Sequence, residues 1–194
     1  MSAPLPRLAL IVGSTRTGRL GNTVARWFLD QATGAGYRDV DVIDLAEADL
    51  PVVMQEFGAT SRPAAVEALS VRLAAAEAFV VVTPEYNHSF PAPLKNAIDW
   101  YRNEWHAKPV GFVSYGGISG GLRAAEQLRP VFAEVHAVTV RDSVSFHHAW
   151  EQFGPDGHPV DPAGCNQAAK TMLDQLDWWA QALNEARAKR PYSA

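Results

Sequence analysis

The chain has 194 residues, of which 47% are hydrophobic and 20% are charged, and its formal net charge at pH 7 is −4. This composition is typical of a single globular domain spanning residues 1–194, and the slight excess of acidic residues argues against nucleic-acid binding. No apolar run approaches the ~20 residues that a membrane-spanning helix requires. The first residues lack the basic and apolar regions of a signal peptide, and the one cysteine, Cys165, cannot form an internal disulfide, so we expect a cytoplasmic protein.

Strands and helices alternate along the chain. Continuous apolar runs such as Leu8–Val12 indicate strands buried on both faces, whereas apolar residues at helical spacing indicate helices. Strands are expected at residues 8–12, 40–45, 78–83, 109–114 and 138–140, and helices at 22–32, 63–77, 93–101, 121–134 and 164–189. The segment 143–165 contains histidines, glycines and prolines, and we expect it to be an irregular surface excursion.

This alternation predicts an α/β fold with a five-stranded parallel sheet covered by helices on both faces. The natural strand order is 2-1-3-4-5, in which the direction of winding changes between the first and third strands. Open sheets of this kind bind ligands at that point, beyond the carboxyl ends of the strands. The loops that follow the first, third and fourth strands therefore form the candidate site.

The loop after the third predicted strand is stiffened by proline. Prolines 84, 91 and 93 fix three φ angles and remove three backbone donors between Thr83 and Pro93. The loop also carries Tyr86 and Asn87 at the end of a buried strand. A rigid wall of this kind is suited to a flat ligand.

The loop after the first predicted strand, Gly13–Thr23, combines glycines and hydroxyl side chains with Arg16 and Arg19 before a helix. Backbone N–H groups and the helix dipole attract anions at a helix start, and arginine adds charge-assisted hydrogen bonds to phosphate. A plain turn capped by Asn22 or Thr23 would explain the glycines but not the two arginines. The loop therefore favours a phosphate site.

The glycine spacing argues against two common nucleotide loops. Gly13 and Gly18 have the spacing of a P-loop, but Arg19-Leu20 stand where lysine and a hydroxyl residue are required. A dinucleotide loop needs glycines that lie closer together. Asp44, at the end of the second strand, would be its ribose-binding acid, so an NAD(P)-binding protein without flavin is the weaker alternative.

The loop after the fourth predicted strand, Ser114–Gly121, contains two Gly-Gly pairs, which let the backbone approach a ligand closely. The letters Gly117-x-Ser119-x-Gly121 match a hydrolase nucleophile elbow. However, Ser119 lies well beyond the strand end, and no partnering aspartate and histidine are identifiable. We interpret this loop as a glycine wall of the candidate site.

These stretches resemble the NADPH-dependent FMN reductases, a flavodoxin-like family that also includes chromate, quinone and azo-dye reductases. The resemblance covers about residues 7–141 and rests on Gly13–Arg16, on Pro84–Asn87 with Pro91–Trp100, and on Ser114–Gly117. It implies a flavodoxin-like three-layer sandwich that binds FMN, with NADPH or NADH as the electron donor.

The resemblance also implies which residues bind FMN. The phosphate would bind to Ser14, Arg16, Asn22 and Thr23, and the ring would lie along Pro84, Glu85, Tyr86 and Asn87. Ser114, Gly116 and Gly117 would lie near the ring or the ribityl chain, and Thr15, Arg19, Gly21 and Tyr115 are also expected to bind the cofactor. Arg19 would serve either the FMN phosphate or the 2′-phosphate of NADPH. Glu85 is equally well explained as a solvated loop carboxylate.

The implied reaction is a ping-pong transfer in which NADPH reduces FMN at N5 and leaves before an oxidised small-molecule acceptor enters. No side chain is an obligatory acid or base, and Tyr86 and Asn87 are the expected ring-facing residues. A flavin, a quinone, an azo compound or a metal oxyanion fits as the acceptor. A non-enzymatic FMN-binding electron carrier is the alternative, although a net charge of −4 is small for steering towards basic partners.

The resemblance further implies a homodimer or a dimer of dimers. Trp100 and Tyr101 lie at the end of the predicted helix 93–101 and Trp105 lies beyond it, and the three are either core residues or part of a subunit contact.

No metal site is expected, because His147, His148 and His158 do not have the spacing of a known site. Cys165 has no histidine or lysine nearby in sequence and is interpreted as an inert thiol.

Overall fold

The apolar runs form the centre of a parallel sheet. The computed structural model describes residues 5–56 and 58–193, and in it β1 (Leu8–Val12), β3 (Ala78–Pro84) and β4 (Pro109–Tyr115) are buried along their whole length. Strand β2 (Val40–Asp44) lies beside β1 at one edge, and β5 (Val138–Thr139) lies beside β4. The order β2-β1-β3-β4-β5, with every pair parallel, confirms the predicted topology.

The sheet also contains a strand that the sequence analysis did not predict. Strand β6 (Val144–Phe146) runs parallel to the carboxyl half of β4, whereas β5 pairs with its amino half. Val144 and Phe146 are buried and Ser145 between them is partly exposed, which is the alternation of an edge strand. The prediction that residues 143–165 are irregular throughout is therefore wrong, and β6 closes the sheet next to the candidate site.

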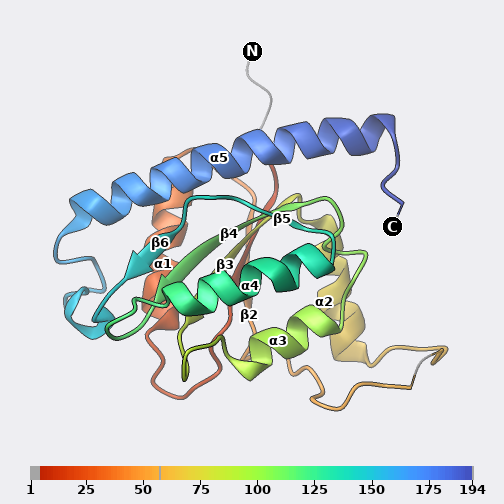
Figure 1. The fold of residues 1–194 in the computed structure, drawn as a ribbon, viewed down its shortest axis with the longest axis horizontal. Coiled ribbons are helices and arrows are strands. Elements are labelled where there is room, and N and C mark those ends of the chain that lie inside the picture. The colour runs from red at the N-terminus through yellow and green to blue at the C-terminus, as the bar shows by residue number, and fades with distance from the viewer. Residues whose placement is uncertain (1–4, 57, 194) are drawn as a thin grey trace.

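Helices cover both faces of the sheet, which confirms the three-layer sandwich (Figure 1). On one face lie α1 (Gly21–Gly34) and α5 (Pro162–Lys189), and on the other lie α2 (Ala64–Ala75), α3 (Ala92–Asp99) and α4 (Leu122–Glu134). Each layer packs its own apolar cluster against the sheet, one containing Phe28 and Leu176 and the other Phe79 and Phe132. Among the described residues, no helix has the length and apolar character needed to cross a membrane.

The helix ends differ slightly from prediction. Helix α2 ends at Ala75 rather than at residue 77, because Ala76 is already extended and leads directly into β3. Pro63 lies at the N-cap of α2. The carboxylate of Asp161 accepts a hydrogen bond from the backbone N–H of Ala163 and caps α5.

Trp100, Tyr101 and Trp105 are core residues, and all three are buried. The Tyr101 hydroxyl donates to the carbonyl of Val66 at 3.0 Å, and the Trp105 ring meets Phe79 edge-on at a centroid distance of 4.7 Å. Of the two interpretations offered by the sequence, these contacts favour the core over a subunit contact.

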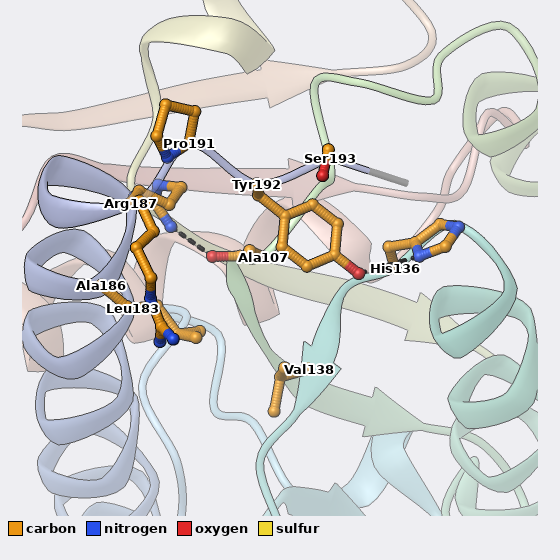
Figure 2. Close-up of a pocket in the computed structure, with 10 residues that line it drawn as sticks. Ala107, His136, Val138, Leu183, Ala186, Arg187, Pro191, Tyr192 and Ser193 are labelled. Carbon is orange, nitrogen blue, oxygen red and sulfur yellow. Dashed lines mark hydrogen bonds between the residues drawn. The ribbon is translucent and has the colours of Figure 1, made fainter.

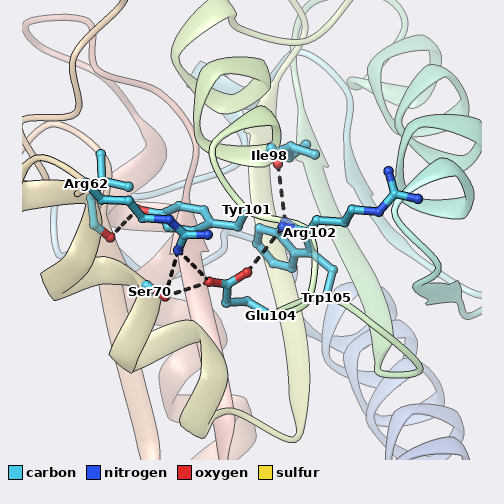
Figure 3. Close-up of polar contacts among 8 residues, drawn as sticks. Arg62, Ser70, Ile98, Tyr101, Arg102, Glu104 and Trp105 are labelled. Carbon is cyan, nitrogen blue, oxygen red and sulfur yellow. Dashed lines mark hydrogen bonds and ion pairs between the residues drawn. The ribbon is translucent and has the colours of Figure 1, made fainter. Parts of the chain in front are cut away.

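A buried carboxylate fastens the turn between α3 and β4 to α2. The side chain of Glu104 is 8% exposed, and its Oε1 accepts hydrogen bonds from Ser70 Oγ at 2.6 Å and Arg62 Nη1 at 3.1 Å (Figure 3). The backbone N–H of Arg102 donates to Oε2 at 3.2 Å. Burial works against the charge, but hydrogen bonds from Ser70 and Arg62 lower the pKa of Glu104 below its usual value. This network links α2, Arg62 just before its N-cap and the turn that follows α3.

Candidate functional site

The three loops singled out in the sequence meet at the carboxyl edge of the sheet. Strand β3 lies between β1 and β4, with Val12 paired to Val82 and Thr83 paired to Ser114. The segments that follow these parallel strands therefore leave the sheet at the same edge and side by side. This arrangement brings the expected cofactor-binding residues together from three distant parts of the sequence.

The loop after β1 presents a helix start that no side chain caps. Helix α1 begins at Gly21 with Leu20 at the N-cap, and no side chain in the described part of the chain caps it with a hydrogen bond. The alternative in which Asn22 or Thr23 caps the helix is therefore wrong, because both residues lie inside the first turn. Its free N–H groups suit an anion.

The two arginines of this loop differ in their surroundings. Arg19 is mostly buried, forms an ion pair with Asp44 and donates from Nε to Asn22 Oδ1 at 3.0 Å. Arg16 is exposed and has no ion-pair partner among the described residues. The charge of Arg19 is thus balanced, and Arg16 supplies the uncompensated positive charge. The carboxylate of Asp44 is already engaged, which weakens the alternative in which it binds a ribose.

A buried hydroxyl lies at the same helix start. The Tyr115 hydroxyl oxygen is buried and has no hydrogen-bond partner among the described residues. A Cβ atom on Gly21 would lie 2.8 Å from that oxygen, so only glycine fits there. Burial raises the pKa of Tyr115, and its hydroxyl therefore keeps its proton as a donor without an acceptor.

A contact of Ser14 joins the loop Gly13–Thr23 after β1 (the phosphate loop) to the loop after β3. Ser14 is completely buried, and its Oγ lies 2.8 Å from the hydroxyl of Tyr86. The backbone N–H of Arg16 points back to Ser14 Oγ at 3.5 Å. Ser14 thus sets the position of the Tyr86 ring rather than standing open to solvent.

The loop after β3 contains a tight hairpin turn. The backbones of Tyr86 and Ser89 exchange two hydrogen bonds, of 2.8 and 3.1 Å, and Asn87 and His88 between them have φ values of +49° and +70°. Two successive positive φ angles define a type I′ turn, which is unusual without glycine. The stiff wall predicted from prolines is thus made more rigid by the turn, and the side chains of Asn87 and His88 are exposed at its tip.

Glu85 belongs to the scaffold of this wall. Its side chain is 7% exposed and accepts hydrogen bonds from the backbone N–H of Arg123 at 3.1 Å and from Arg123 Nη1 at 3.2 Å. Burial opposes the charge, but hydrogen bonds from Ser119 and Arg123 lower the pKa of Glu85. Glu85 is therefore no solvated carboxylate. Among the described residues no histidine is hydrogen-bonded to the Ser119 side chain, although a hydrolase would require one.

The hydroxyl groups of Ser114 and Ser145 fix the backbone of the glycine wall. Ser114 Oγ donates to the carbonyl of Gly120 at 2.9 Å, and Ser145 Oγ donates to the same carbonyl at 2.8 Å. Gly121 has a φ of +82°, and a Cβ there would lie 2.7 Å from the backbone nitrogen of Tyr115. Ser114 is fully buried, so its hydroxyl shapes the loop while Gly116 and Gly117 are partly exposed.

Sequence reasoning missed two parts of this edge. The first is the segment after β6, which brings His148 and Trp150 against the glycine wall. The second is a groove of about 330 Å³ beside the phosphate loop, lined among others by Leu50, Pro93 and Asn96. The alternation Val144-Ser145-Phe146 is too short to serve as a periodic signal for the first, and the groove depends on tertiary packing.

The histidines and the cysteine take no part in a shared site. His147, His148 and His158 are exposed, and the described residues contain no cluster of three or more potential metal ligands. Cys165 is partly buried, and burial raises its pKa, so its thiol stays protonated at neutral pH.

A second hollow lies at the opposite edge of the sheet. It measures about 380 Å³ and is lined by residues from the start of β4, from β5 and from the end of α5. Figure 2 shows Tyr192 reaching across it towards His136, whose Nδ1 lies 2.9 Å from the tyrosine hydroxyl. None of the expected cofactor-binding residues lines this hollow.

Comparison with known proteins agrees with this geometry. The model of a family described as NADPH-dependent FMN reductase matches residues 6–151. An NAD(P)H-dependent FMN reductase of Schizosaccharomyces pombe is 37% identical over 134 residues, which are 65% of each chain and so just under two thirds of that protein. A probable NADPH:quinone oxidoreductase 2 of Oryza sativa subsp. japonica is 30% identical over 97% of this chain and 95% of its own.

Solved structures give the same result. FerB, a flavoenzyme NAD(P)H:(acceptor) oxidoreductase from Paracoccus denitrificans, superposes with a TM-score of 0.69 at 25% identity, over 93% of this chain and 98% of its own. A Megasphaera elsdenii flavodoxin shares the fold with a TM-score of 0.54 at 11% identity. The resemblance expected from the sequence and the flavodoxin-like fold are both confirmed.

Proposed function

Because the chain belongs to the NADPH-dependent FMN reductase family and is thus an oxidoreductase, we propose that it passes electrons from NADPH or NADH through bound FMN to a small-molecule acceptor. The observation that carries this proposal is the uncapped start of α1 between the exposed Arg16 and the unpartnered hydroxyl of Tyr115. Donors left free by the fold at one place are what a bound phosphate requires.

The residues at the carboxyl edge fit the FMN phosphate. Arg16 would supply the charge, and the first N–H groups of α1 would supply backbone donors. The protonated hydroxyl of Tyr115 would gain the acceptor that it lacks in the folded chain alone. Asp44 holds Arg19 beside Asn22, so we assign Arg19 to shaping the loop rather than to neutralising the phosphate.

The chain contributes binding and orientation rather than acid–base chemistry. When bound, FMN supplies an N5 atom that accepts a hydride and returns the electrons to an acceptor. The Pro84–Asn87 wall, with Tyr86 fixed by Ser14, would support the flat ring from one side. The partly exposed Gly116 and Gly117 would let the backbone approach it.

We infer that donor and acceptor use the same edge in turn, in a ping-pong order. Support comes from the convergence of all three loops on one edge, and the names of relatives such as the rice quinone oxidoreductase favour a quinone acceptor. Initial rates with FMN-loaded protein, NADPH and a quinone are expected to give parallel double-reciprocal lines. Intersecting lines would reject the ping-pong order, and absence of NADPH oxidation would favour the electron carrier.

A homodimer or a dimer of dimers is a separate proposal. Val52, Val53 and Met54 lie in the loop beyond β2 and expose large apolar side chains, and Val52 also lines the groove beside the phosphate loop. A subunit contact there would bury them. Light scattering at micromolar concentration is expected to give at least twice the mass of the chain, and a monomeric mass would refute the proposal.

A further inference from the structure

Strand β6 leads into a turn that lays Trp150 on the glycine wall. The backbone N–H of His148 donates to the carbonyl of Gly117 at 2.9 Å, and that of Ala149 donates to the carbonyl of Gly116 at 3.0 Å. His148 has a φ of +45°, a left-handed conformation that is uncommon outside glycine and persists only where surrounding contacts hold it. This turn positions the short helix η1 (Ala149–Glu151) at the carboxyl edge.

The far edge of the Trp150 indole lies beside Gly117. A Cβ atom on Gly117 would lie 3.5 Å from Cη2 and 3.9 Å from Cζ3 of Trp150, so the ring edge borders the space that this glycine leaves open. Nevertheless, 64% of Trp150 is exposed. Its N–H donates to the adjacent Glu151, and among the aromatic rings of the described residues only that of His148 packs against it, edge-on at 5.8 Å. A large aromatic side chain exposed beside a candidate ligand site is suited to stacking with a ligand ring.

Trp150 is continuous with the candidate flavin site. The backbone N–H of Glu85 donates to the carbonyl of Tyr115 at 3.1 Å, and a Cβ on Gly116 would lie 3.6 Å from that of Glu85. The next residue, Gly117, lies beside the Trp150 ring. The proline-stiffened wall, the glycine wall and the indole thus form one surface along the carboxyl edge.

We propose that Trp150 is a substrate-positioning residue whose exposed face stacks on planar aromatic acceptors such as quinones. This inference rests on the proposed function and adds the residue that discriminates between acceptor classes. An aromatic pair strengthens binding by about twofold to tenfold. A small inorganic acceptor such as ferricyanide has no ring to stack and gains nothing from the indole. Trp150 therefore favours quinones over ferricyanide.

The kinetic test compares the two acceptors in FMN-loaded protein with saturating NADPH. For Trp150→Ala we expect KM for 1,4-naphthoquinone to rise about twofold to tenfold while KM for ferricyanide is unchanged. Trp150→Phe should retain most of the quinone preference. The matched control is Trp178→Ala, because Trp178 is also 64% exposed but lies on α5, and it should change neither KM.

A binding test without NADPH separates this inference from the proposed function. Naphthoquinone should quench part of the tryptophan fluorescence of the wild-type protein, and this component should vanish in Trp150→Ala but persist in Trp178→Ala. Equal KM changes for both acceptors, quenching that survives Trp150→Ala, or a raised KM for NADPH would overturn the assignment. If the wild-type protein oxidised NADPH with neither acceptor, the proposed function would fail, while the quenching result would still decide the role of Trp150.

Discussion

Two sets of polar side chains, one at each edge of the parallel sheet, differ in whether the fold satisfies them. At the amino edge, Glu104 is bonded to side chains of two other segments, and the buried ammonium of Lys108 donates to two carbonyls at the end of α2 at 3.0 and 2.9 Å. At the carboxyl edge, Arg16 is exposed without an ion pair and the Tyr115 hydroxyl is buried without a partner. Partnered polar groups stabilise the fold, whereas donors left free are available to a ligand.

The largest expected effect is on stability at the amino edge. Glu104→Ala removes the acceptor of Ser70 and Arg62 and should lower the free energy of unfolding by about 2–3 kcal/mol, because polar groups in a buried network lose their partner. Urea unfolding measures this change. FMN affinity should stay within about twofold, and Glu134→Ala, at an exposed position, is the control. A large loss of FMN affinity in Glu104→Ala, with an unchanged free energy of unfolding, would show that Glu104 serves ligand binding rather than the stability of the fold.

The next effect is on ligand binding at the carboxyl edge. Arg16→Ala should raise the dissociation constant of FMN by roughly tenfold to a hundredfold, the contribution of hydrogen bonds to a charged group. Its free energy of unfolding should change by less than about 0.5 kcal/mol, because the side chain is exposed. Fluorescence titration with FMN gives the affinity. Arg26 is an exposed arginine on α1, and Arg26→Ala should bind FMN normally. Equal losses of FMN affinity in both variants would show that the net positive charge, rather than a contact of Arg16, is what matters.

A smaller effect separates two buried tyrosines. Tyr115→Phe removes a hydroxyl without a partner, so stability should not fall, but FMN should bind about threefold to tenfold more weakly. Tyr101→Phe removes a hydroxyl that donates to Val66, so stability should fall by about 1 kcal/mol with normal FMN affinity. Thermal unfolding and FMN titration of both variants check this crossed pattern. A stability loss in Tyr115→Phe would show that its hydroxyl is already bonded within the chain.

The smallest effect concerns pH. The pKa of Glu104 is lowered in the folded chain, so its contribution to stability is present above the ordinary carboxyl pKa of about 4.3 and is lost as the pH falls through the folded value. Between about pH 6 and pH 3, Glu104→Gln should therefore lose less stability than the wild-type protein. Urea unfolding across this range tests the difference. The free energy of unfolding of Glu134→Gln should depend on pH as that of the wild-type protein does. If the free energy of unfolding of Glu104→Gln fell as steeply with pH as that of the wild type, Glu104 would not contribute to the loss of stability in acid.

The sequence predicted the central sheet because its strands are buried on both faces and read as continuous apolar runs, as in Phe79–Val82. It did not reveal β6, because three residues within a segment rich in histidine, glycine and proline are too few for a periodic signal. The sequence identified the loop residues, but it did not show which of them hold the loops in place and which are left free for a ligand. That Arg19 is neutralised by Asp44, and that Ser14 fixes Tyr86, depends on the registers of β1 with its two neighbours.

The central claim is that the free donors at the carboxyl edge bind FMN and that the bound flavin takes electrons from NADPH. The most direct measurement is the absorbance spectrum of the protein after incubation with FMN and removal of free flavin, followed by anaerobic addition of NADPH. We predict that the wild-type protein retains flavin, that Arg16→Ala retains much less, and that the flavin absorbance of the wild type bleaches with NADPH. Retained flavin that stays yellow, or equal retention by the two proteins, would contradict the account.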